Sequence, residues 1–259
     1  MSHGDKSNST EVTRCRVLRA LVTRPREEAL SLAAALAGRG IAAVIEPMME
    51  IYYCSETAPE LANVQAVLCT SANGVRALAR ITRERELPLL AVGDATGSYA
   101  GAEGFTNVVS AGGTMADLVR LAVTRLRPQW GRLLHIAGET IAGDLSGALW
   151  AQGFAIDRIV LYEARPVEAL SKSVIGALCS NMIDFALFFS PRTAAIFVKL
   201  VKRAGLAECC RAITAVSISP AADAALTALP WHDRQVAERP SQGAMLDRLD
   251  RAVGERQRL

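Results

Sequence analysis

The chain is 259 residues long, which suits two domains of ordinary size or one large domain. Hydrophobic residues make up 51% of the chain and aromatic residues only 5%, a mixture that favours β-strands buried under small-residue helices over a β-sandwich. The net charge of +3, carried by scattered basic residues, argues against the dense positive stripe of a nucleic-acid-binding protein.

Residues 1–14 are polar and contain no apolar run, so we expect them to form a disordered tail. They lack the hydrophobic segment of a secretory signal, and nowhere do about 18 apolar residues follow one another without interruption. The expectation is a cytoplasmic protein that does not enter a membrane.

After the tail, short apolar runs alternate with longer amphipathic segments. Strands are predicted at about 18–23, 41–46, 65–70, 88–93, 106–110, 132–137, 154–162, 184–190, 212–218 and 234–238. These runs are apolar throughout, which is typical of strands covered on both faces. Between most of them lie segments with helical spacing, and this alternation predicts parallel sheets with right-handed crossovers. In the helix predicted at 27–38, the expected buried face consists of Ala29, Leu30, Ala33, Leu36 and Ala37.

Ten strands favour two sheets of about five, since open twisted sheets rarely stay intact at ten. Two extended segments, 46–56 and 157–166, interrupt the alternation and are expected to pair as a connector. The fold class predicted is α/β, with two parallel-sheet lobes of the Rossmann or flavodoxin type joined by two strands. The predicted boundaries are 15–46 plus 167–259 for a discontinuous first lobe, 57–156 for an inserted second lobe, and 47–56 with 157–166 for the connector.

Two pairs of similar segments support this division. Residues 66–80 (AVLCTSANGVRALAR) and 185–199 (FALFFSPRTAAIFVK) share a strand, a serine and a helix in the same order. Residues 89–100 (LLAVGDATGSYA) and 213–226 (ITAVSISPAADAAL) form the second pair. Each pair is expected to occupy equivalent places in the two lobes, although any two βα units look somewhat alike.

Four strand-to-helix corners combine a hydroxyl residue with a proline or a small residue: 23–25, 70–73, 190–192 and 219–220. Serine and threonine are favoured helix N-caps, and free N–H groups in the first helical turn attract anions. The plain alternative is a set of helix caps without a ligand. If the corners of both lobes face one cleft, they would accept a ligand with many carboxylates or phosphates.

Other chemistry finds little support in the sequence. The six cysteines show no CxxC spacing, and the three histidines have no partner at metal-ligand spacing, so neither a disulfide framework nor a metal site is expected. No nucleotide-binding fingerprint or GxSxG motif occurs, and Thr114 with Asp117 predicts a capping box. His135 is expected to be a hydrogen-bonded core residue. Tyr162 lies in the predicted connector, where its phenol either faces the cleft or packs at a hinge.

Short motifs follow one another along the chain in a distinctive order. They are TRP (23–25), TSANGV (70–75), AVGDATG (91–97), LLHIAGE (133–139), VLYEARP (160–166), FFSPRTAAIF (188–197) and ISPAADAAL (218–226). In this order and spacing the chain resembles the uroporphyrinogen-III synthase family over about residues 17–253.

The resemblance implies two α/β lobes and a substrate, hydroxymethylbilane, that carries eight carboxylates. The implied reaction removes the terminal hydroxyl as water, inverts ring D through a spiro intermediate and closes the ring as uroporphyrinogen III, without a cofactor. Tyr162 matches the tyrosine that is the family's usual candidate for assisting departure of the hydroxyl. The substrate-binding residues expected from the matching corners and their arginines are Arg24, Ser71, Ala72, Arg76, Gly93, Thr96, Gly138, Ser190 and Arg192.

The chain departs from the family at 219–222, where it reads Ser-Pro-Ala-Ala and many members read Gly-x-Thr-Ala. The missing hydroxyl leaves a second interpretation open, a non-catalytic two-lobed module inside the cell that binds a small anionic ligand. A nucleotide-dependent enzyme would need a phosphate loop, which the sequence lacks. The expected partners are the small-molecule substrate and, transiently, the upstream deaminase, with no nucleic acid and no membrane; the chain itself is expected to be a monomer.

Overall fold

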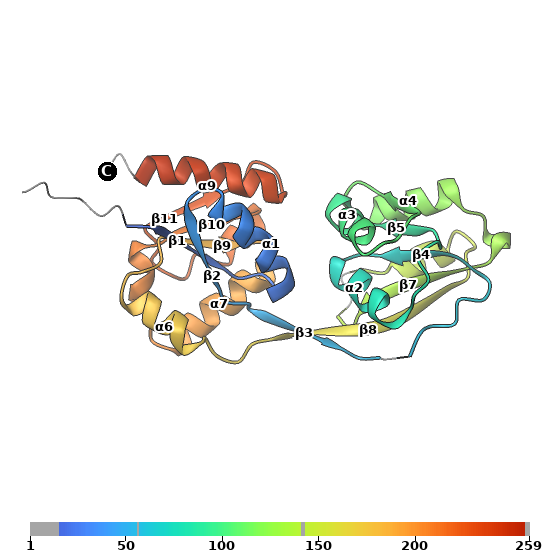
Figure 1. The fold of residues 1–259 in the computed structure, drawn as a ribbon, viewed down its shortest axis with the longest axis horizontal. Helices are drawn as coiled ribbons and strands as arrows, with labels where there is room; N and C mark the ends of the chain where they lie inside the picture. The colour runs from blue at the N-terminus through green and yellow to red at the C-terminus, as the bar shows by residue number, and fades with distance from the viewer. Residues whose placement is uncertain (1–15, 56, 141–142, 257–259) are drawn as a thin grey trace, which may run out of the picture. The chain divides into compact units, whose positions relative to one another are not determined.

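The computed structural model describes residues 16–55, 57–140 and 143–256, and the tail predicted at 1–14 lies outside them. The chain divides into two compact units (Figure 1). Unit 1 comprises Met1–Met48 and Val167–Leu259, and unit 2 comprises Met49–Pro166. Unit 1 is therefore built from two separate stretches of the chain.

The sheet of unit 1 has five parallel strands in the order β11-β10-β9-β1-β2. The strands are β1 (Leu18–Val22), β2 (Ile41–Ile45), β9 (Phe185–Phe188), β10 (Thr214–Ser217) and β11 (Asp233–Val236). The helices are α1 (Arg26–Ala37), α6 (Lys172–Cys179), α7 (Pro191–Arg203), α8 (Pro220–Ala224) and α9 (Gln242–Arg256), with a 3-10 helix at Ala207–Ala212.

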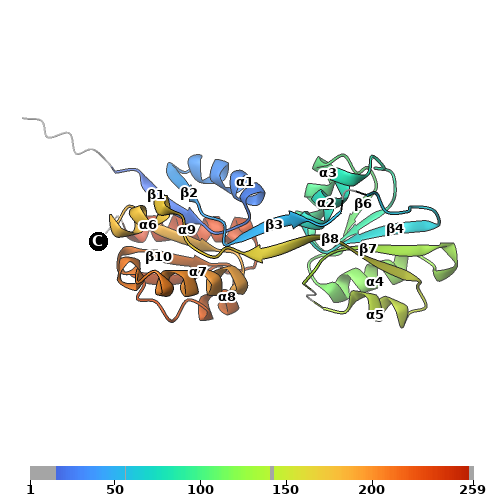
Figure 2. The same cartoon turned by 90° about the horizontal axis from the view of Figure 1, so that it is seen from below.

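Helices cover both faces of this sheet. Buried side chains of α1 and α9 pack in one cluster with β1, and those of α6 and α7 pack in a second cluster on the other face. In Figure 2, α1 lies above the sheet while α7 and α8 lie below it. The central strand β9 is consequently buried along its whole length, which explains why its sequence is apolar rather than alternating.

The sheet of unit 2 has six strands in the order β3-β8-β7-β4-β5-β6. The strands are β3 (Met49–Tyr53), β4 (Val64–Cys69), β5 (Leu89–Ala91), β6 (Val108–Ser110), β7 (Arg132–Gly138) and β8 (Ile156–Pro166). The helices are α2 (Ala72–Ile81), α3 (Asp94–Ala102), α4 (Met115–Arg125) and α5 (Leu145–Trp150), with a 3-10 helix at Pro128–Trp130. Helices α2 and α3 cover one face of the sheet, and α4 and α5 cover the other.

The segments expected to pair are strands β3 and β8, which run antiparallel from Met49 opposite Pro166 to Tyr53 opposite Tyr162. All other strand pairs described in the two sheets are parallel. A register shift between Ala137 and Gly138 places Gly138 opposite Tyr162. The predicted fold class, α/β with two parallel sheets, is confirmed, and β3 is the antiparallel exception.

The two sheets repeat one arrangement. Without β3, the strand order of unit 2 is β6-β5-β4-β7-β8, and it corresponds to the order β11-β10-β9-β1-β2 of unit 1. Strand β4 therefore corresponds to β9, and β5 corresponds to β10. Ser71 caps the helix after β4, and Ser190 caps the helix after β9. Gly93 and Ser219 begin the helices after β5 and β10. The prediction that the similar segments occupy equivalent places is confirmed.

One local prediction is correct only in part, and another is wrong. In α1 the predicted residues Ala29 and Leu36 are buried, but Leu32 completes the buried face and Leu30 is 58% exposed. Thr23 does not cap α1: its hydroxyl donates to the carbonyl oxygen of Leu187 on the neighbouring strand, at 2.7 Å. Helix α1 begins after Pro25 without a side-chain cap.

Candidate functional site

The candidate site lies at the carboxyl ends of the parallel strands of unit 2, where ligands bind in open α/β sheets. Strand β4 ends at the corner that begins α2. The hydroxyl of Ser71 accepts a hydrogen bond from the Gly74 amide at 3.1 Å and so caps the helix, as predicted. A Cβ atom on Gly74 would lie only 3.3 Å from the carbonyl oxygen of Ile136, so the first turn of α2 packs directly against β7.

Tyr162 is half-buried in β8, and its side chain packs against the same cluster as α2. Its phenolic oxygen lies 2.8 Å from the Ser71 hydroxyl. The ring also lies against Gly138, where an added Cβ atom would come within 2.8 Å of the ring atoms Cε2 and Cζ. Tyr162 therefore contacts two other predicted site residues, Ser71 and Gly138.

Arg158 holds the end of β7 next to this cluster. One of its guanidinium nitrogens, Nη2, donates to the carbonyl oxygens of Gly138 at 2.6 Å and Glu139 at 3.2 Å. The Glu139 amide in turn donates to the carbonyl oxygen of Tyr162 at 2.9 Å. Arg158 was not among the predicted site residues, although it is a charged residue directly before the apolar run IVLY at 159–162.

The corner after β5 approaches the loop after β6 closely. Gly93 begins α3, and a Cβ atom there would lie 3.3 Å from the Cα atom of Gly113. Gly112 and Gly113 have φ angles of 97° and 131°, which favour glycine, and the Gly113 amide donates to the carbonyl oxygen of Val92. The predicted capping box of Thr114 then starts α4. Thr96 is buried in α3, and Ala72 is the half-buried first residue of α2.

Two predicted arginines have protein partners. In unit 2, Arg76 donates to the Tyr99 hydroxyl at 2.9 Å and the Asn73 side chain at 2.7 Å, and its guanidinium stacks over the Tyr99 ring. It thereby links α2 to α3. In unit 1, Arg24 donates to Glu28 and Gln242 and stacks over Phe189. The contacts show roles for both arginines within their units, and substrate binding by either one stays a prediction.

The remaining predicted residues lie at the start of α7 in unit 1. The hydroxyl of Ser190 accepts from the Thr193 amide at 3.1 Å and lies 3.0 Å from the Thr193 hydroxyl. Arg192 is exposed in the first turn of this helix. These residues occupy a corner equivalent to the one that holds Ser71, and their contact with substrate stays a prediction.

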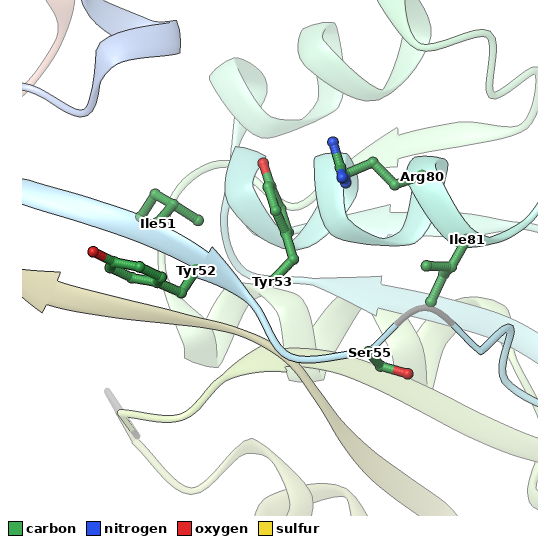
Figure 3. Close-up of a pocket in the computed structure, with 6 residues that line it drawn as sticks. All are labelled: Ile51, Tyr52, Tyr53, Ser55, Arg80 and Ile81. Carbon is green, nitrogen blue, oxygen red and sulfur yellow. The ribbon is translucent and has the colours of Figure 1, made fainter.

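A cavity of about 730 Å³ opens beside the site in unit 2 (Figure 3). Its lining consists of Ile51, Tyr52, Tyr53, Ser55, Arg80 and Ile81. The Arg80 guanidinium lies 4.4 Å from the centre of the Tyr53 ring, and Tyr53 is the strand partner of Tyr162. Tyr53 and Arg80 were missed as candidate site residues. Only the pairing of β3 with β8 brings Tyr53 beside Tyr162, and Arg80 on α2 contacts Tyr53 from a separate segment of the chain.

His135 lies in the interior of unit 2, and only 6% of its surface is exposed. The prediction of a core residue is right, but the prediction of a hydrogen bond is wrong, since neither ring nitrogen has a partner in the part of the chain that the structure describes. Burial, together with the charge of Arg158, lowers the pKa of His135 to about 4. The imidazole is therefore neutral near pH 7.

Neither the two buried thiols nor a metal cluster adds a site within the part of the chain that the structure describes. Burial raises the pKa of Cys69 and of Cys210 to about 12, which leaves both thiols protonated and unreactive. Within 16–55, 57–140 and 143–256, no group of three or more His, Cys, Asp or Glu side chains could hold a metal ion. Nor is any helix in those stretches both long and apolar enough to cross a bilayer.

Comparisons with known proteins identify a family and a shared fold. A sequence model of the family described as uroporphyrinogen-III synthase HemD matches residues 31–247. The structure is similar to that of uroporphyrinogen-III synthetase from Helicobacter pylori, with 16% identity and a TM-score of 0.58 over 91% of this chain and 99% of the other. It is also similar to a mutant uroporphyrinogen III synthase from Thermus thermophilus, with 18% identity and a TM-score of 0.52 over 92% of this chain and 99% of the other.

No curated protein matches the sequence significantly. At these identities the two solved structures establish a shared fold, while the family match extends over most of the chain. Both findings agree with the family resemblance that the order of the sequence motifs indicates. The chain therefore belongs to the uroporphyrinogen-III synthase family.

Proposed function

We propose that the protein is a uroporphyrinogen-III synthase that cyclises hydroxymethylbilane, inverts ring D and releases one water, a lyase reaction that needs no cofactor. Membership of the family supports the overall reaction. The observation that carries the assignment in this chain is the phenol of Tyr162, held 2.8 Å from Ser71 at the carboxyl ends of the strands in unit 2.

Binding of the substrate carboxylates is assigned mainly to main-chain N–H groups in the first turns of α2 and α3. The positive end of a helix dipole favours a carboxylate there, and unpaired amides in the first turn can donate to it. Arg24 and Arg76 already have acidic or polar partners, so each one contributes only part of its hydrogen-bonding capacity to a ligand. Recognition is therefore distributed over many weak contacts.

In the chemical step, the Tyr162 hydroxyl donates its proton to the departing hydroxyl of the substrate, which leaves as water. Breaking this C–O bond leaves a carbon electrophile, which ring D attacks through its already substituted α-carbon to form a C–C bond and a spiro intermediate. The bond from that α-carbon to its original methylene bridge then breaks and leaves a second carbon electrophile. The turned ring D attacks this electrophile through its free α-carbon and closes the macrocycle. The proton that this ring loses when it regains aromaticity returns to the phenolate. The sum is loss of one water, with Tyr162 regenerated as a general acid.

Orientation provides most of the rate enhancement in this proposal. Hydroxymethylbilane can close unaided to the isomer with ring D unturned, so the protein must hold the geometry that leads to inversion. Positioning of reacting groups can supply roughly 7–11 kcal/mol of barrier reduction. One phenol with a modest catalytic role is then sufficient, and the absence of the family's threonine at 219–222 removes only a contact of about 0.5–1.5 kcal/mol.

The test is to incubate the purified protein with hydroxymethylbilane and to identify the isomer of the oxidised uroporphyrin. We expect the type III isomer, formed faster than the unturned isomer appears in buffer alone. Formation of only the unturned isomer, at the rate seen in buffer, would refute synthase activity. Binding of hydroxymethylbilane without turnover would instead favour the non-catalytic binding module.

We also propose that the chain acts as a monomer and receives its substrate through transient contact with the upstream deaminase. The support is chemical, because a substrate that closes spontaneously to the wrong isomer is best transferred quickly. Sedimentation velocity tests the monomer. Chemical cross-linking of the two proteins during turnover tests the contact, and the deaminase without its substrate is the control.

A further inference from the structure

The hydroxyl of Ser71 has two contacts that serve different purposes. It accepts from the Gly74 amide, which caps α2, and it is hydrogen-bonded to the phenol of Tyr162 at 2.8 Å. A serine hydroxyl has one hydrogen and two acceptor lone pairs, so both contacts can exist at once. The phenol is thereby tied to the first turn of a helix that packs closely against β7.

Gly138 fixes the other side of the same phenol. An added Cβ atom would lie 2.8 Å from Cε2 and Cζ of Tyr162 and 3.0 Å from its hydroxyl oxygen, distances at which the ring must shift. Gly138 is also the strand partner of Tyr162 across the register shift in β7 and β8. The absence of a side chain at 138 therefore provides the space that the ring occupies.

Unit 1 shows that the fold itself does not require this arrangement. Ser190 caps α7 at the equivalent corner by the same contact to an amide three residues later. The four tyrosines of the chain are Tyr52, Tyr53, Tyr99 and Tyr162, and all of them belong to unit 2. The same strand–serine–helix corner thus forms in unit 1 without a phenol.

We propose that Ser71 and Gly138 are positioning residues for Tyr162: the Ser71 hydroxyl holds the phenol oxygen in place, and Gly138 leaves room for the ring. This inference deepens the proposed function and rests on it for the catalytic role of Tyr162. It assigns to the Ser71 side chain a role separate from any main-chain contact with substrate.

The decisive variant is Ser71→Gly, because glycine is nearly as good an N-cap as serine but has no hydroxyl. We expect kcat to fall about 3- to 10-fold, as for loss of one hydrogen bond, with little change in KM. Ser71→Thr should restore most of the lost kcat. Ser241→Gly, which removes a serine cap from the start of α9, is the matched control and should leave kcat unchanged.

A double-mutant cycle separates positioning from general damage. In a Tyr162→Phe background, Ser71→Gly should cause no further loss of kcat, since the phenol oxygen is already absent. Gly138→Ala should lower kcat toward the value of Tyr162→Phe. An equal loss from Ser71→Gly in both backgrounds would overturn the proposal.

A spectroscopic measurement decides the question without turnover. With tyrosine labelled at 13Cζ there are four resonances, and the resonance of Tyr162 is identified by its loss in Tyr162→Phe. Ser71→Gly and Gly138→Ala should both shift this resonance in the free protein, while Ser241→Gly should not. An unchanged resonance in Ser71→Gly would overturn the positioning role, whereas inactive wild-type protein would refute the proposed function and leave this result standing.

Discussion

His135 on β7 and Arg158 on β8 are partners in the parallel register of the two strands, so their side chains lie on the same face of the sheet. The imidazole is buried without a hydrogen-bond partner among the described residues, while the guanidinium reaches the carbonyl oxygens of Gly138 and Glu139. Burial first, and the charge of Arg158 second, lower the pKa of His135. The buried imidazole of His135 thus lies next to the arginine that binds the end of β7.

Stability should fall in mildly acidic solution because of His135. Its pKa is about 4 in the folded protein against 6.5 for the free side chain, so between these values the unfolded chain binds a proton that the folded chain does not. The free energy of unfolding should therefore decrease as the pH falls from about 6.5 to about 4, by roughly 3 kcal/mol from this residue. Urea unfolding at pH 7, 5.5 and 4.5 measures it.

The control for this pH dependence is His135→Leu, which has no proton to bind. This variant should also be more stable than wild type at pH 7, by about 1–3 kcal/mol, because it removes two unpaired buried nitrogens. His232→Gln, at an exposed position, provides a second comparison. A His135→Leu protein with the same pH dependence as wild type would show that other groups are responsible.

Arg158→Met should disorder the end of β7. The substitution keeps an apolar stem but loses the donors to Gly138 and Glu139, and we expect about 1–3 kcal/mol less stability and a roughly 10-fold lower kcat/KM. The pKa of His135 should rise but stay below its usual value, because burial persists. Arg132→Met is the matched control, because Arg132 lies at the opposite end of β7 and donates there to the carbonyl oxygen of Glu60.

Tyr162→Phe should slow turnover roughly 10²-fold, the lower end of the range for general acid assistance. The change in KM should be small, because the proton is donated mainly in the transition state. The product should remain the type III isomer, since positioning by the protein persists. Steady-state kinetics with isomer analysis measures both effects, and a Phe variant with wild-type kcat would make Tyr162 a packing residue.

The buried face of α1 can be tested with two leucines of the same helix. Leu32 is fully buried, whereas Leu30 is 58% exposed. Leu32→Ala should cost about 2–5 kcal/mol of unfolding free energy, and Leu30→Ala no more than about 0.5 kcal/mol. Chemical denaturation compares them directly, and equal losses would contradict the packing of α1 against the sheet.

Local sequence patterns determined much of this architecture. Apolar runs such as 185–188 mark strands because a strand covered on both faces has no position for a polar side chain. Ser71 and Ser190 mark the starts of helices because a cap bonds an amide only three residues away. The repeat of these corners in two sheets was visible for the same reason, since each corner is a short segment with its own hydrogen bonds.

Only the tertiary structure decided which of these residues meet. Ser71 and Tyr162 are 91 residues apart, and their contact depends on the strand order and on the register shift that brings Gly138 opposite Tyr162. The bond of Thr23 to Leu187 and the links of Arg76 to Tyr99 likewise join separate elements. Spacing within one segment determines which side of a helix or strand a residue faces. The residue that it contacts on that side depends on how segments distant in sequence pack together, and a local sequence pattern holds no information about that packing.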